Sequence, residues 1–121
     1  MSRTISITKT PRGSLSPKKI KPEEFIKAVE SDEEFIWLED SIGPETPYNG
    51  YRRKSAALWN WENAPKAPRI SFTLTEAGTI DFGFRGSRYD DLLLDKMCEF
   101  ARNLHAYVED DEGTILFDPN A

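Results

Sequence analysis

The sequence is poor in the side chains from which catalytic and metal sites are usually built. Its 121 residues include one cysteine, Cys98, and one histidine, His105. A lone cysteine cannot form an internal disulfide, so nothing indicates an oxidising compartment. A lone histidine excludes two-histidine zinc sites and leaves a Ser-His-Asp triad without a marked partner. We therefore expect no catalytic residues, no metal and no cofactor, and we do not expect an enzyme.

Long apolar runs are also missing. The longest, such as Leu92-Leu93-Leu94, are a few residues long, whereas a membrane-spanning helix needs ~20 apolar residues. Residues 1–7 alternate polar and apolar side chains and lack the apolar core of a secretion signal. We expect a cytoplasmic protein with no membrane partner.

Three sequence patterns could suggest a catalytic dyad, a calcium site or a nucleotide-binding loop, but none has the spacing that such a site requires. Cys98 and His105 are seven residues apart, which in a helix separates them by about 10.5 Å along the axis, while a Cys–His dyad requires hydrogen-bond contact. The run Glu109–Gly113 lacks the spaced ligands of a calcium loop and is typical of a hairpin turn. Residues 83–86 have too few glycines for a nucleotide-binding loop.

The charge that is present is unevenly distributed. Residues 1–22 contain six Lys or Arg and no acidic residue, whereas residues 23–50 contain nine Asp or Glu and only Lys27 as a cation. The net charge is −5, which argues against a nucleic-acid partner because such binding depends on Lys and Arg that neutralise phosphates. An acidic chain suits a basic protein partner, although a mildly acidic surface can also serve solubility alone.

The periodicity of apolar residues predicts one α+β domain over residues 1–121. Helices are expected over about 21–31 and after Gly86, the second with Ser87 as its N-cap. Residues 43–50 should form a surface loop, because they combine two prolines with two glycines. Strands are expected at residues 3–8, 34–38, 57–61, 70–75, 80–85, 106–109 and 114–117. These elements indicate a mainly antiparallel sheet of about five to seven strands with two helices packed on one face.

The buried faces of these elements can also be predicted. The second helix should bury a stripe of Leu93, Met97, Phe100, Ala101 and Leu104 and expose Asp91, Asp95, Glu99 and Arg102. Residues 70–75 and 80–85 alternate strictly around Gly78, which predicts an antiparallel hairpin.

Partner-binding candidates come from aromatic and acidic residues. Tyr, Trp and Arg are over-represented at binding hot spots, and four aromatics cluster near Arg52-Arg53. Trp59 and Trp61 share one face of their expected strand, so they could equally belong to the core. The candidates for partner contact are Glu39, Asp40, Glu45, Tyr48, Tyr51, Trp59, Trp61, Asp110, Asp111 and Glu112.

Both ends of the chain resemble a group of small bacterial proteins. Residues 5–13, Ile-Ser-Ile-Thr-Lys-Thr-Pro-Arg-Gly, followed by the helix that starts at Pro22-Glu23-Glu24-Phe25, are similar to the start of immunity proteins of contact-dependent growth inhibition and related polymorphic toxin systems. Residues 100–113, where a helix runs into a strand and an acidic turn, are similar to their usual ending, although Glu112-Gly113 inverts the usual Gly-Glu order.

This resemblance implies a cytoplasmic antitoxin that binds one cognate toxin C-terminal domain, often a nuclease, and occludes its active site or a nearby surface. It implies no catalytic residues. A nuclease toxin has a basic cleft, to which an acidic inhibitor would be steered. The alternatives are a general protein-binding adaptor domain and a small enzyme with an unrecognised site.

Overall fold

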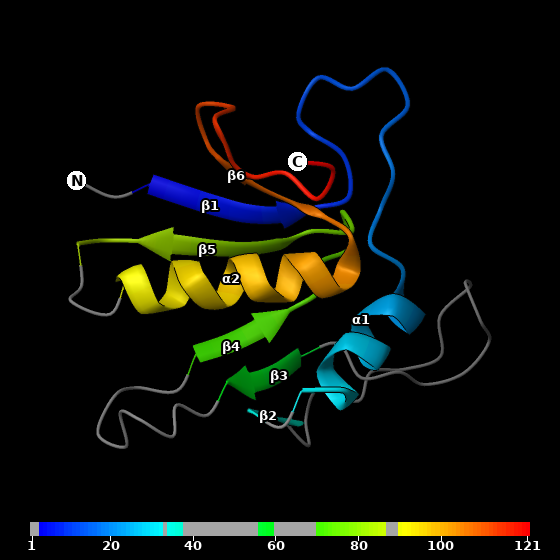
Figure 1. Cartoon of the computed structure of the whole chain (residues 1–121), viewed down its shortest axis with the longest axis vertical. Helices are drawn as coiled ribbons and strands as arrows, with labels where there is room; N and C mark the ends of the chain where they lie inside the picture. The colour runs from blue at the N-terminus through cyan, green and yellow to red at the C-terminus, as the bar shows by residue number, and fades with distance from the viewer. Residues whose placement is uncertain (1–2, 33, 38–55, 60–69, 87–89) are drawn as a thin grey trace. The chain divides into compact units, whose positions relative to one another are not determined.

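The computed structural model of the chain describes residues 3–32, 34–37, 56–59, 70–86 and 90–121 (Figure 1). The chain divides into two compact units. The first unit contains residues 1–20 and 75–121, and the second contains residues 21–74. The second unit is therefore an insertion in the sequence of the first, and each unit is described below by itself.

The first unit contains an antiparallel sheet of four strands in the order β5-β1-β6-β7. β1 (Arg3–Thr8) lies between β5 (Ile80–Phe84) and β6 (Tyr107–Asp110), and β7 (Ile115–Phe117) pairs with β6. The register places Ile5 beside Phe82 and Ile7 beside both Ile80 and Val108. Because side chains alternate along a strand, these apolar residues share one face of the sheet, and all of them are buried.

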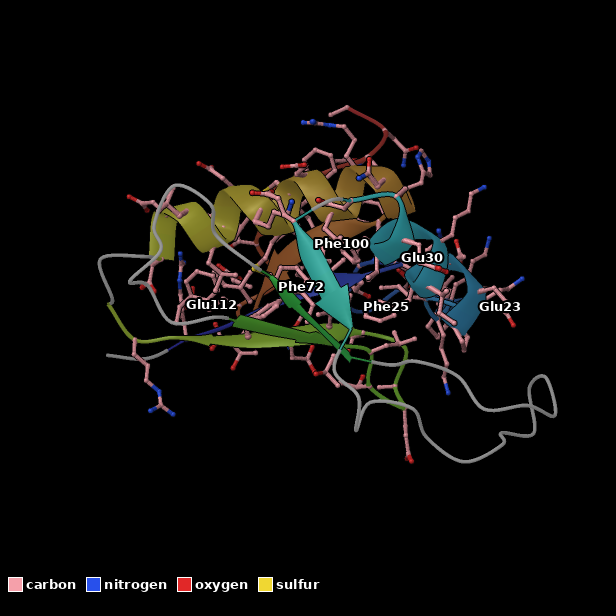
Figure 2. The ribbon with its side chains drawn as sticks, turned by 90° about the horizontal axis from the view of Figure 1, so that it is seen from below. Glu23, Phe25, Glu30, Phe72, Phe100 and Glu112 are labelled. Carbon is pink, nitrogen blue, oxygen red and sulfur yellow. The ribbon has the colours of Figure 1, made fainter. Side chains whose placement is uncertain are left out.

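Helix α2 (Asp90–Leu104) packs against β1 and β6 of this sheet. Its expected core stripe from Leu93 to Leu104 is buried, and its expected outer residues are exposed, which confirms the helical periodicity. Phe100 lies at the centre of the stripe and is completely buried (Figure 2).

The described residues of the second unit form a three-stranded antiparallel sheet in the order β2-β3-β4 and one helix. The strands are β2 (Phe35–Trp37), β3 (Ala56–Trp59) and β4 (Ile70–Thr73). α1 (Pro22–Glu30) begins with proline at its first position, where no intrahelical donor is needed, and the Glu24 side chain accepts a hydrogen bond from the Lys21 N–H at 3.1 Å. Phe25 is buried on this helix, whereas Glu23 is exposed (Figure 2).

The structure confirms the α+β class and the antiparallel pairing, with two helices among the described residues. It differs from the expectation in how the strands are grouped. Instead of one sheet of five to seven strands with both helices on one face, the larger sheet has four strands, and three further strands form another sheet. Sequence alternation identifies strands and their buried faces, but it carries no information on which non-local strands pair.

The predicted hairpin of residues 70–85 is wrong in its pairing. β4 pairs with β3 and β5 pairs with β1, so the two strands belong to different sheets. The predicted turn does form, because the Thr75 N–H donates to the Thr79 carbonyl at 2.9 Å and Gly78 has φ +78°. Gly78 is also required sterically, since an added Cβ would lie 2.3 Å from the Lys19 Cβ.

Within the described part of the chain, neither helix has the length and apolar character needed to cross a membrane.

Candidate partner-binding surface

The acidic segment that begins at the last residue of β6 forms a tight turn, as its sequence predicts. The Asp110 N–H donates to the Thr114 carbonyl at 3.0 Å, and the Gly113 N–H donates to the Asp110 carbonyl at 3.1 Å. Gly113 has φ +86°, a backbone conformation that glycine adopts without a steric penalty. We call residues 110–112 the acidic turn.

Asp110 holds the acidic turn in shape. Its side chain is only 8% exposed, and its Oδ1 accepts hydrogen bonds from the backbone N–H groups of Glu112 and Thr114, both at 2.9 Å. The other carboxylate oxygen lies 3.8 Å from an Arg3 guanidinium nitrogen. The Thr114 N–H is the main cause of a lowered pKa of the Asp110 carboxyl group, assisted by the Glu112 N–H and the Arg3 charge.

Asp111 and Glu112 are the members of the acidic turn that face solvent. Both are exposed (Glu112 in Figure 2). The Asp111 carboxylate accepts one hydrogen bond, from the Thr4 N–H at 3.3 Å. The turn therefore presents two carboxylates on a backbone that Asp110 has already ordered, which lowers the entropy that a partner would have to remove.

Arg12 connects the basic N-terminal segment to this acidic region. Its N–H donates to both carboxylate oxygens of Glu109, at 3.2 and 3.0 Å, and its Nη1 donates to the Asp111 carbonyl at 2.9 Å. Glu109 is only 7% exposed. No feature of the sequence predicts this contact, because the two segments are 97 residues apart and Glu109 is one of several consecutive acids.

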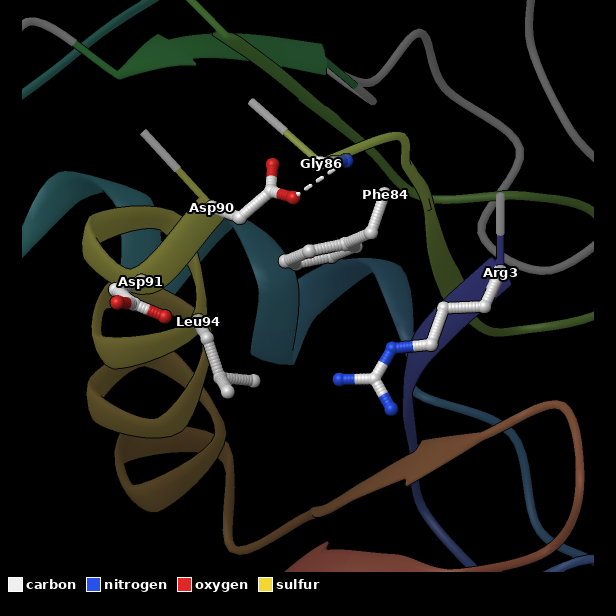
Figure 3. A pocket seen from close by; sticks show the side chains of 6 residues that line it. All are labelled: Arg3, Phe84, Gly86, Asp90, Asp91 and Leu94. Carbon is white, nitrogen blue, oxygen red and sulfur yellow. Dashed lines mark hydrogen bonds between the residues drawn. The ribbon is translucent and has the colours of Figure 1, made fainter. Parts of the chain in front are cut away.

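A small pocket lies on the same unit, between the start of β1 and the first turns of α2 (Figure 3). It has a volume of about 290 Å³ and an apolar wall that includes Phe84. The Asp90 carboxylate is held by the Gly86 N–H at 3.0 Å. The described residues of its lining include no nucleophile or histidine; they are Arg3, Phe84, Gly86, Asp90, Asp91 and Leu94. This volume is at the lower end of the ~300–1,000 Å³ found for small-molecule sites.

Cys98 lies on helix α2, and His105 lies at the end of this helix. Cys98 is half-buried on α2, and burial, with a smaller effect of Asp95, raises the pKa of its thiol. A raised pKa keeps a thiol protonated and weakly nucleophilic. His105 has φ +53° directly after α2, where its N–H donates to the Arg102 carbonyl at 3.2 Å, and the Ala106 N–H donates to the Ala101 carbonyl at 2.8 Å. This pair of bonds is the Schellman motif that ends many helices.

Seven further residues are predicted to contact the partner. Glu39, Asp40, Glu45, Tyr48, Tyr51 and Trp61 lie outside the described residues, as do the expected loop 43–50 and the expected N-cap Ser87. The backbone of Trp59 lies in β3, paired with Phe35 and Ile70. Of the ten candidates, the structure brings together Asp110, Asp111 and Glu112.

No protein-family model matches the chain, and no curated protein matches it at a significant level.

Proposed function

We propose that this protein is a cytoplasmic immunity protein that binds a cognate bacterial toxin domain and neutralises it by occluding its active site or a nearby surface. The observation that carries the proposal is the acidic turn. Its backbone is fixed by Asp110, while the carboxylates of Asp111 and Glu112 remain exposed. Fixed, exposed carboxylates suit a protein whose work is to bind a positively charged surface.

The net charge of the molecule supports the same proposed function. The net charge is −5, and a nuclease toxin must present a basic surface to its polyanionic substrate. Long-range attraction would raise the association rate of such a pair, and the acidic turn would compete with the phosphates for the basic cleft. The resemblance of residues 5–13 and 100–113 to immunity proteins names the class of partner.

Co-expression tests the proposal most directly. The probe is the C-terminal region of the protein encoded by the adjacent upstream reading frame, expressed from an inducible promoter with and without this chain. We expect the chain to restore growth. Equal survival with and without the chain would refute the immunity function.

A kinetic measurement tests the role of the acidic turn. The double variant Asp111→Lys, Glu112→Lys should slow association with the same toxin domain by about tenfold or more at low salt, and the difference should shrink as salt screens the charges. Asp91→Lys, Asp95→Lys, a double charge reversal of exposed residues on α2, is the matched control. An association rate equal to that of the control would exclude the acidic turn from the interface.

A further inference from the structure

The segment between β1 and α1 presents an apolar side chain where none is expected. Leu15 is 102% exposed, the highest exposure among the large apolar residues that the structure describes. Single exposed leucines are common on protein surfaces and need no explanation by themselves. The surroundings of Leu15 give it more weight, because the segment around it is both ordered and cationic.

Hydrogen bonds fix the segment on both sides of Leu15. On one side, the Arg12 N–H is held by the Glu109 carboxylate, and the Ser14 N–H donates to the Pro11 carbonyl at 3.2 Å. On the other side, the Lys18 N–H donates to the Thr10 hydroxyl oxygen at 3.1 Å. The Ile20 N–H then donates to the Gly78 carbonyl at 3.0 Å. Leu15 is thus exposed to solvent on a loop that hydrogen bonds hold at both ends.

Among the described residues, two cations of this loop are bound by backbone carbonyl oxygens rather than by carboxylates. Arg12 donates its Nη1 to the Asp111 carbonyl, and Lys19 donates its Nζ to the Glu76 carbonyl at 3.2 Å. A carbonyl oxygen orients a cation without cancelling its charge. Lys18 is also exposed, and residues 1–22 contain no acidic residue. Leu15 therefore lies in a cationic loop in which backbone carbonyls hold the side chains of Arg12 and Lys19.

We infer that Leu15 is an anchor side chain of the partner interface, and that the partner offers it an apolar pocket with an acidic rim that meets Arg12 and Lys18. The inference rests on the proposed function, because its partner is the same toxin domain. Arg12 contacts both Glu109 and Asp111, so the loop lies beside the acidic turn and one partner can cover both. A preorganised apolar anchor surrounded by charged contacts is a common design of protein interfaces.

A protein partner fits these observations better than a membrane or a nucleic acid. One leucine contributes too little to hold a protein on a bilayer, where even a single myristoyl chain gives only marginal binding. Single-stranded nucleic acid is bound through stacking aromatic side chains, and residues 9–20 contain none.

The test compares Leu15→Ala with Leu92→Ala, the control, which truncates an exposed leucine on α2. Both variants should unfold at the same denaturant concentration as the parent chain. Binding to the toxin domain should weaken about tenfold for Leu15→Ala, mainly through faster dissociation, and stay unchanged for Leu92→Ala. Lys18→Glu should slow association, because it repels an acidic rim.

Each contrary result identifies what has failed. If the parent chain does not bind the toxin domain at all, the proposed function and this inference fail together. If the parent binds and Leu15→Ala binds equally well, only the inference fails. A loss of stability in Leu15→Ala would show that Leu15 packs within the chain, and faster association of Lys18→Glu would show a basic rim. Cosedimentation of the parent chain with vesicles of phosphatidylcholine and phosphatidylserine would assign the loop to a membrane instead.

Discussion

Asp110 makes the stability of the acidic turn depend on pH. Its pKa is lowered in the folded chain, first by the Thr114 N–H, relative to an ordinary aspartate value of about 3.9. The ionised carboxylate therefore stabilises the fold above the unfolded-state pKa, and this contribution is lost as the pH falls through the lower folded-state value.

We expect Asp110→Asn to be less stable than the parent chain at pH 7, with a difference that shrinks as the pH falls and disappears in strong acid. Urea unfolding over a series of pH values measures this difference. Asp81→Asn, an exposed aspartate on β5, is the control and should show a smaller effect. A deficit of Asp110→Asn that is independent of pH would mean that shape, rather than charge, accounts for the role of Asp110.

His105 occupies a backbone conformation that glycine adopts more easily. Its φ of +53° at the end of α2 costs a residue with a Cβ about 1–2 kcal/mol, and the larger chain entropy of unfolded glycine offsets about half of that. His105→Gly should therefore raise the free energy of unfolding by about 0.5 kcal/mol, whereas the β-branched His105→Val should lower it. Chemical denaturation of both variants checks the order, and a less stable glycine variant would contradict it.

Some roles of single residues could be predicted from the sequence and others could not. The burial of Phe100 and the exposure of Asp95 follow from helical periodicity, since both depend only on neighbours along the chain. The different roles of Glu109, Asp110 and Asp111 do not follow from the sequence, where they are three consecutive acids. Glu109 and Asp111 are bound by Arg12 and Thr4, which are far away in the chain, whereas Asp110 is held mainly by the N–H groups of Glu112 and Thr114 in its own turn.

Helix α2 provides much of the core of the first unit. Phe100 is completely buried at the centre of its stripe, and Phe100→Ala should lower the free energy of unfolding by about 3–5 kcal/mol. Leu92→Ala, on the same helix but 49% exposed, should change it by less than about 0.5 kcal/mol. Equal effects of the two substitutions in urea titrations would show that the stripe is not the packed face.

Elements were easier to predict than their partners. The sequence predicts a helix at about 21–31, and α1 occupies Pro22–Glu30, because proline, the acidic first turn and the apolar spacing are all local signals. β4 and β5 were also found, but not their pairing. A short turn at Gly78 favours a hairpin, yet β5 pairs with β1, which is more than 70 residues earlier in the sequence, and β4 pairs with β3 in the other sheet. Which strand pairs with β5 depends on the packing of the whole unit.

The fold of the first unit brings together charges that are far apart in the sequence. The basic N-terminal segment and the acidic turn meet through Arg12 and Asp111, which are 99 residues apart in the sequence. The blocks of charge could be read from the sequence, but their adjacency could not. The proposed interface therefore consists of an acidic and a basic part side by side, rather than the acidic surface alone that the net charge suggests.

The arrangement of the first unit also predicts how the chain can be divided. The second unit leaves the first after residue 20 and returns at residue 75. These two points are close in space, since the Ile20 N–H donates to the Gly78 carbonyl at 3.0 Å and Lys19 contacts Glu76. A short linker can therefore join residue 20 to residue 75 without straining the four-stranded sheet.

We expect a chain in which a short Gly-Ser linker replaces residues 21–74 to fold, with lower stability than the parent because a smaller domain buries a smaller fraction of its surface. Dispersed amide resonances and a cooperative urea transition would show this, and Phe100→Ala in the shortened chain should abolish both. An unfolded shortened chain would mean that the two units depend on each other and form the single domain that the sequence predicts. Since the acidic turn and Leu15 both belong to the first unit, a folded shortened chain should also retain their contacts with the toxin domain.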